Sequence, residues 1–137
     1  MSLAGARHVE VMAAMNDFPV GATTLHLAPE DVWKRAAGAE SYVPDAFAAD
    51  GFVHCTNGDE NLIAVGNRYY TADPRPFLAL TIAIDRLTAP IRYDDPARTF
   101  PHIYGPVNRA AIVAMRTVIR DGDGEFIAIA NDEVALQ

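Results

Sequence analysis

The segment Phe77-Leu-Ala-Leu-Thr-Ile-Ala-Ile84 decides the fold, because it is nearly continuous in apolar character and predicts a buried, central β-strand. A short strand is predicted downstream at Ile91-Arg-Tyr93, and residues 112–119 alternate weakly in polarity. The sequence Asp121-Gly-Asp-Gly124 then provides a hairpin turn, after which residues 125–130 return as the last strand. The C-terminal half is therefore predicted to consist mainly of strands and hairpins.

The N-terminal half is predicted to supply two helices and two strands, of which the second covers residues 51–56. Residues 23–27 alternate in polarity and predict a strand, and Pro29 stands in the first turn of a helix that ends near Gly38. Asn57 and Glu60 have the spacing of a capping box, which predicts a second helix. Its apolar stripe is expected to contain Leu62, Val65, Gly66 and Tyr69. Two early helices followed by hairpins predict an α+β fold rather than a doubly wound sheet.

The length and composition of the sequence predict a single domain that needs no disulfide. The chain has 137 residues, and we expect an N-terminal arm over residues 1–20 followed by one domain over residues 21–137. Cys55 is the one cysteine, and we find no signal peptide and no membrane-spanning apolar stretch, which favours a cytoplasmic protein. The net charge of −7 argues against a large nucleic-acid-binding surface, but it allows a local basic pocket for a small phosphorylated ligand.

Strand periodicity separates the side chains around Cys55. Alternate residues of a strand face opposite sides, so Phe52, His54 and Thr56 are expected on one face, with Val53 and Cys55 on the other. Neighbouring residues of a strand cannot form a Cys–His catalytic pair. We therefore predict that Cys55 belongs to the core and is not a nucleophile.

Three histidines are the main candidates for a functional site. Alternation places His26 on a polar face of its strand, and we expect it to share a pocket with His54; the alternative is a structural histidine whose hydrogen bonds are satisfied. The segment Phe100-Pro-His-Ile-Tyr-Gly-Pro106 is predicted to be a rigid loop that presents His102 and Tyr104. The same segment could instead be a stiff connector whose aromatic rings cap the core.

Other chemistry is less well supported by the residue pattern. The spacing of the histidines, 28 and then 48 residues, matches no metal-ligand pattern, so no metal is expected. No Gly-x-Ser-x-Gly motif occurs. Arg68 and the pair Tyr69-Tyr70 could reach an anion or an aromatic ring, or could be a surface arginine beside core tyrosines. Asp94-Asp95 could be acid–base groups or part of an exposed turn.

Three motifs resemble those of the bacterial "domain of unknown function 952" family. They are Leu25-His-Leu-Ala-Pro29, Asp50-Gly-Phe-Val-His-Cys-Thr56 and Phe100-Pro-His-Ile-Tyr-Gly-Pro106, in the order in which that family has them. The resemblance covers roughly residues 23–128. This resemblance implies no activity, because the family has no established activity.

A more distant resemblance is to the NAD-dependent RNA 2′-phosphotransferases, which have the ADP-ribosyltransferase-like fold. It is carried by Phe52-Val-His-Cys-Thr56, by Ala64-Val-Gly-Asn-Arg68 and by the apolar strand that ends at Asp85. The resemblance implies two small, mostly antiparallel sheets with flanking helices and NAD in the cleft between them. His26 and His54 would then line the nicotinamide and ribose side. Phe52 departs from that family, which has a histidine at this position.

The resemblance implies that Thr56 takes the place of a sugar-contacting serine and that Arg68 matches a helix arginine of that family. We therefore predict an NAD-related transferase or nucleotide-processing enzyme with NAD as its substrate. The candidate catalytic residues are His26, His54 and His102, and the candidate binding residues are Thr56, Arg68, Tyr69 and Tyr104. The alternatives are a non-catalytic module that binds a nucleotide or phosphorylated metabolite, and an interaction domain in which these motifs only stabilise the fold.

Overall fold

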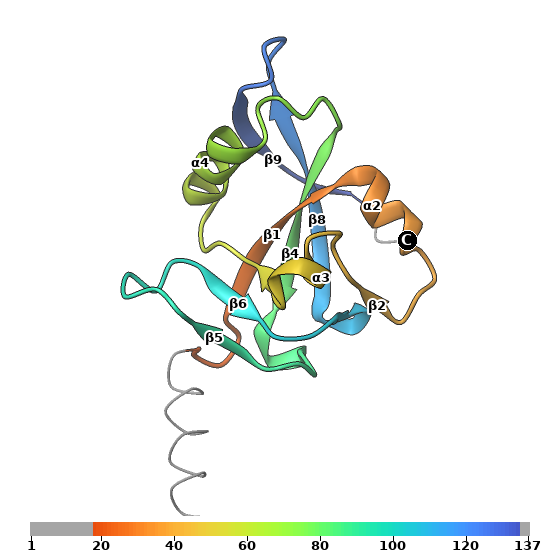
Figure 1. Ribbon diagram of the computed structural model, residues 1–137, viewed down its shortest axis with the longest axis vertical. Coiled ribbons are helices and arrows are strands. Elements are labelled where there is room, and N and C mark those ends of the chain that lie inside the picture. Colours follow the sequence, from red (N-terminus) through yellow and green to blue (C-terminus); the bar gives the residue numbers. More distant parts are fainter. Residues whose placement is uncertain (1–17, 135–137) are drawn as a thin grey trace, which may run out of the picture.

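The computed structural model describes residues 18–134 (Figure 1). Its largest element is an antiparallel sheet of four strands in the order β1-β4-β8-β9, which are β1 (Thr23–Pro29), β4 (Phe77–Ala83), β8 (Ile112–Arg120) and β9 (Phe126–Val134). The apolar run quoted above therefore forms an interior strand, as predicted. The expected N-terminal arm lies outside the described residues, apart from residues 18–20.

Two further antiparallel sheets are small. One has the order β3-β6-β5, with β3 (Val53–His54), β6 (Pro101–Ile103) and β5 (Ile91–Tyr93), and the other pairs β2 (Ser41–Tyr42) with β7 (Val107–Asn108). The described residues thus form an α+β fold with three sheets, where two were expected. The segment predicted to be a rigid loop contains β6, so this prediction was wrong. Pro101 is tolerated because it begins the strand, and its carbonyl accepts a hydrogen bond from the Cys55 N–H.

The helices of the described chain are short. They are α2 (Glu30–Arg35), α3 (Phe47–Asp50) and α4 (Asp59–Tyr69), with 3₁₀ turns η1 (Ile84–Arg86) and η2 (Arg109–Ala111). The predicted capping box is wrong, because Gly58 is the N-cap of α4 and no side chain caps it. Asn57 instead accepts a hydrogen bond from the Thr24 hydroxyl and donates one to the Tyr93 hydroxyl. Among residues 18–134, no helix has the length and apolar character needed to cross a membrane.

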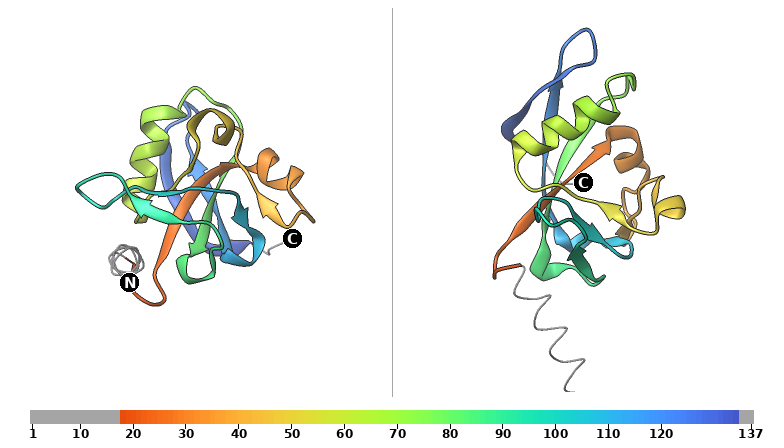
Figure 2. Two further views of the ribbon diagram at one scale, coloured as in Figure 1. Left: turned by 60° about the horizontal axis from the view of Figure 1, so that its bottom comes forward. Right: turned by 60° about the vertical axis from the view of Figure 1, so that its left-hand side comes forward.

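The four-stranded sheet has a hydrophobic cluster on each face. On one face, α4 packs through Leu62 against Phe77, Phe126 and their neighbours. On the other face, Leu80 and Ile82 pack against α2 and against the small sheets. Strand β1 lies at the edge of the large sheet, so the layers of both faces meet beside it (Figure 2). Cys55 is buried in the second cluster, as predicted.

Candidate functional site

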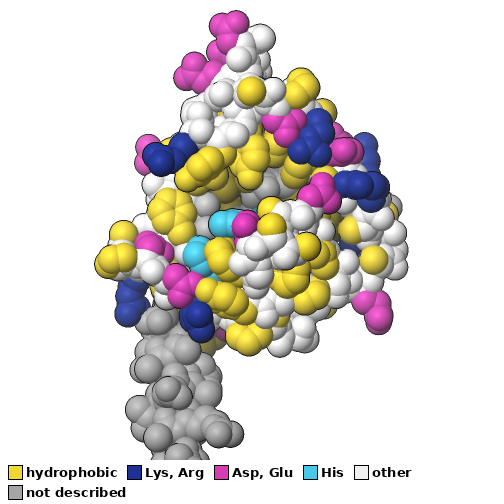
Figure 3. Space-filling model, in the orientation of Figure 1, with side chains coloured by type: hydrophobic (Ala, Val, Ile, Leu, Met, Phe, Trp, Pro, Cys, Tyr) yellow, Lys and Arg dark blue, Asp and Glu magenta, His cyan; other side chains and the backbone are white. Residues whose placement is uncertain are grey.

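A cleft of about 190 Å³ lies beside β1, where α4, α2 and the segment around β3 meet. Its walls are mostly apolar and include Val32, Leu62 and Val65. Figure 3 shows this face of the molecule, where histidine side chains are visible near a hollow that hydrophobic side chains surround. His26 and His54 both line the cleft, so the structure brings together two of the three candidate histidines.

His26 is buried, and both of its ring nitrogens have partners. Nδ1 lies 2.7 Å from the carbonyl oxygen of His54, and Nε2 lies 3.1 Å from the hydroxyl oxygen of Tyr42. A carbonyl only accepts, so Nδ1 carries the proton and Nε2 accepts from Tyr42. Burial lowers the pKa of His26 from 6.5 to about 4, and burial also raises the pKa of Tyr42. His26 is therefore a neutral imidazole that fixes the backbone of His54.

His54 forms a dyad with Asp50 at the wall of the cleft. Its Nε2 lies 2.8 Å from a carboxylate oxygen of Asp50, and its side chain is 58% exposed. Gly51, which has φ 81°, ends α3 and turns the chain so that these two side chains meet. Because a carboxylate accepts, Nε2 carries the proton and Nδ1 is left as an acceptor.

Three rings pack together next to the cleft. Phe52 lines the cleft and stacks on His102 with ring centroids 3.9 Å apart and an angle of 15° between the rings. His54 and His102 are directly opposite each other on β3 and β6, and their ring centroids are 5.5 Å apart. His102 therefore adjoins the cleft through Phe52 and His54, although it is not one of the residues that line it.

The carboxylate of Asp94 orients the His102 ring through a hydrogen bond. His102 Nδ1 lies 2.8 Å from the carboxylate of Asp94, which also accepts a hydrogen bond from the Tyr104 hydroxyl and pairs with Arg92 at 3.1 Å. Arg92 lies over the ring of Tyr104, 4.3 Å from its centroid. The hydrogen bond from Tyr104, followed by those from His102 and Arg92, lowers the pKa of Asp94 to about 2. The carboxylate is thus ionised at neutral pH and fixes the His102 imidazole.

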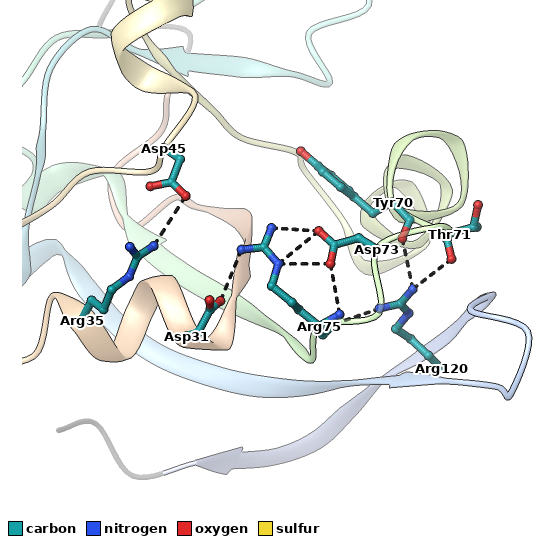
Figure 4. Close-up of polar contacts among 8 residues, drawn as sticks. All are labelled: Asp31, Arg35, Asp45, Tyr70, Thr71, Asp73, Arg75 and Arg120. Carbon is teal, nitrogen blue, oxygen red and sulfur yellow. Dashed lines mark hydrogen bonds and ion pairs between the residues drawn. The ribbon is translucent and has the colours of Figure 1, made fainter.

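Two of the residues that line the cleft, Asp45 and Arg75, form ion pairs (Figure 4). Arg75 lines the cleft and pairs with Asp73 at 2.8 Å and with Asp31 at 3.4 Å. Arg35 pairs with Asp45 at 3.5 Å, which connects α2 to the segment before α3. The Asp73 carboxylate raises the pKa of Arg75. The charge of Arg75 is therefore already neutralised by these carboxylates.

The candidate binding residues lie in different places. Thr56 is buried and lines the cleft, and its backbone pairs with Leu25 of β1. Tyr69 is 65% exposed, and Arg68 lies over its ring; neither is among the residues that line the cleft. Tyr69 was expected on the apolar stripe of its helix, which was wrong, because Leu62 and Gly66 form the buried face.

Tyr70, named from the sequence together with Tyr69, lines the cleft, but sequence reasoning missed three other residues of this region. Arg75 follows the second helix and lines the cleft, whereas Asp50 and Tyr42 orient the two histidines. Asp50 precedes Gly51 in a motif quoted above, so a short turn between an acid and a histidine was the available signal. No comparable signal points to Tyr42, because its contact with His26 depends on the tertiary fold.

These features define a small α+β protein of antiparallel sheets, with a histidine-containing cleft at the edge of the largest sheet. The chain belongs to the family described as "Protein of unknown function (DUF952)", whose family model matches residues 27–115. Comparison with curated proteins gave no match.

Two solved structures of one protein resemble the fold. They are X-ray crystal structures of protein CC0527 from Caulobacter crescentus, one of the protein itself and one of a double mutant. Sequence identity is 18% and 17%, the TM-score is 0.65 for both, and the match covers 77% of this chain and 93% of the other. Similarity at this level of identity shows a shared fold and leaves function to be argued from the site.

Proposed function

We propose that the cleft binds the nicotinamide and ribose end of NAD, and that the protein is an NAD-related transferase or nucleotide-processing enzyme. The observation that carries this proposal is that His26 and His54 line one cleft, although they are 28 residues apart in the sequence. The resemblance to the NAD-dependent RNA 2′-phosphotransferases assigns these two histidines to the nicotinamide and ribose side. Thr56, at the position of a sugar-contacting serine, lines the same cleft.

The size and walls of the cleft suit one aromatic ring. Its volume of about 190 Å³ is smaller than the roughly 300–1,000 Å³ typical of pockets that enclose a drug-sized ligand. Phe52 and Tyr70 supply aromatic side chains, against which a nicotinamide ring could stack. The rest of NAD would then lie on the adjoining surface, outside the cleft.

The two histidines have different proposed roles. His26 is a positioning residue, because both of its nitrogens are engaged and it holds the carbonyl group of His54. His54 offers Nδ1 as an acceptor for a ribose hydroxyl while Asp50 holds Nε2. When the bond to nicotinamide breaks, positive charge develops at the ribose C1′. Hydrogen bonds to the ribose and the negative charge of the Asp50 carboxylate would interact more strongly as this charge grows. They would thereby lower the barrier to cleavage of the bond to nicotinamide.

The ADP-ribosyltransferase-like fold is part of the same proposal. The cleft adjoins both the four-stranded sheet, through His26 of β1, and the β3-β6-β5 sheet, through His54. A site between two antiparallel sheets is what that fold implies. A cytoplasmic location would supply NAD, and the net charge of −7 favours a small-molecule substrate over a nucleic acid.

Ligand-observed NMR with NAD, ADP-ribose and nicotinamide tests the proposal. We expect the wild-type protein to bind at least one of these compounds and His54→Ala to abolish the binding. Ile127→Ala, which alters an exposed side chain of β9, is the matched control and should bind like the wild type. Release of nicotinamide from bound NAD would identify an enzyme, whereas binding without turnover would identify a non-catalytic binding module. The absence of binding at millimolar concentration would refute the NAD-based function.

A further inference from the structure

A second set of polar side chains adjoins the cleft and has no role in holding the nicotinamide ring. It consists of Arg92, Asp94, His102 and Tyr104, which we call the Asp94 network. Arg92 and His102 lie directly opposite each other on β5 and β6, and Asp94 and Tyr104 are the residues that directly follow those strands. The network adjoins the cleft through two lining residues, because Phe52 stacks on His102 and the centroid of the His54 ring lies 5.5 Å from that of the His102 ring.

The network fixes one imidazole and leaves one of its nitrogens available. His102 donates from Nδ1 to the Asp94 carboxylate at 2.8 Å, so neutral His102 has an acceptor lone pair on Nε2. Within residues 18–134, Nε2 makes no hydrogen bond, and the side chain is 18% exposed. Stacking on Phe52 prevents the ring from tilting. A histidine that is oriented through Nδ1 by a carboxylate and open at Nε2 has the arrangement of a general base.

We propose that His102 is the general base that takes the proton from an attacking hydroxyl group or water molecule, and that the Asp94 network forms the acceptor side of the reaction. This inference rests on the proposed function. The acceptor oxygen forms a bond to the ribose C1′ while the bond from C1′ to the nicotinamide nitrogen breaks. The electron pair of the broken bond moves to that nitrogen, and the acceptor proton moves to Nε2 of His102, which later releases it to solvent.

The charges of the network indicate the class of acceptor. Arg92 and Asp94 are paired with each other at 3.1 Å, so the surface presents no excess of positive charge for a polyanion. Its groups instead suit hydrogen bonds with a hydroxyl group. We assign the acceptor to water or to a small neutral compound that carries hydroxyl groups. Asp94 acts through His102 and is a positioning residue.

The test compares wild type, His102→Gln and Asp94→Asn, with NAD as substrate and with water alone or glycerol as acceptor. Asp123→Asn removes the same charge at the tip of the β8–β9 hairpin and is the matched control. NAD affinity is measured by ligand-observed NMR, and nicotinamide release and the ADP-ribose and glycerol products are measured by chromatography over a range of NAD concentrations, which gives kcat and KM.

We expect His102→Gln to bind NAD within about twofold of wild type and to release nicotinamide roughly 10²–10⁴-fold more slowly, the usual contribution of a general base. Asp94→Asn should lose at least about tenfold, because the amide can donate to Nδ1 and favour the tautomer protonated on Nε2. Its KM for NAD should stay within about twofold of the wild-type value while kcat falls, because Asp94 orients the base and does not bind NAD. A purely structural role for Asp94 would change KM as well.

The outcomes separate this inference from the proposed function. If both variants bind and turn over NAD like the wild type, His102 is not the base, and the proposed function stands without it. If the wild type neither binds NAD nor releases nicotinamide, the proposed function fails and the inference fails with it. If His102→Gln does not fold, as judged by circular dichroism, the kcat and KM of Asp94→Asn decide.

Discussion

Acidification should destabilise the protein through His26. The folded state lowers the pKa of this buried imidazole from 6.5 to about 4, chiefly because burial disfavours its charged form. Between these two values the unfolded chain binds a proton that folded His26 does not bind. The stabilisation is therefore complete above about pH 6.5 and is lost as the pH falls towards 4. The shift corresponds to about 3 kcal/mol of the free energy of unfolding.

The assay is urea denaturation at a series of pH values between 4 and 7.5, on wild type and on His26→Asn. The asparagine amide can replace the Nδ1–H donor to the His54 carbonyl, but it does not titrate. Subtracting the two stability curves removes the contribution of the other titrating groups. We expect the difference between the curves to change by about 3 kcal/mol between pH 7 and pH 4. Parallel curves would refute the assignment of His26 as a buried, neutral imidazole.

Three other residues, Gly66, Cys55 and Asn57, give separate predictions. Gly66→Ala should lower the free energy of unfolding by about 1–3 kcal/mol in urea denaturation, because a Cβ there would lie 2.5 Å from the Phe126 ring. Gly122→Ala, with open space around it, should change this free energy by less than about 0.5 kcal/mol, and equal effects of the two substitutions would contradict this packing. Cys55, whose thiol is buried and has a raised pKa, should react with a thiol reagent only after denaturation, so rapid labelling of the native protein would be inconsistent with its position. Asn57→Ala should cost about 1–3 kcal/mol in the same denaturation assay, since it leaves a partly buried hydroxyl without its acceptor, whereas no loss would show that these hydrogen bonds are replaced by water.

The local pattern of the sequence was sufficient to predict the main strands and the turn of the last hairpin. The apolar run of residues 77–84 became the interior strand β4, because a strand covered on both faces needs apolar residues on both. The turn at residues 121–124 joins β8 to β9, as its glycines predicted. The short strand at residues 91–93 is also present as β5. These features depend on composition within a few residues, which a sequence displays directly.

The geometry of the site could be predicted only in part. Alternation correctly separated Cys55 from His54, but it placed His26 on a polar face, whereas both faces of β1 are covered and His26 is buried. The two interpretations of His26 turn out to be compatible, since it is fully hydrogen-bonded and also lines the cleft. Tyr42 and Arg75 could not be predicted, because their contacts arise where separate segments meet in the tertiary fold.

The central claim is that the cleft beside β1 receives a nicotinamide ring. It is tested most directly by recording the amide and aromatic NMR signals of the protein during a titration with nicotinamide. We predict that the largest shifts occur at Phe52, His54 and Tyr70, all of which line the cleft. Shifts concentrated on the β8–β9 hairpin, or no shifts at millimolar nicotinamide, would contradict the account.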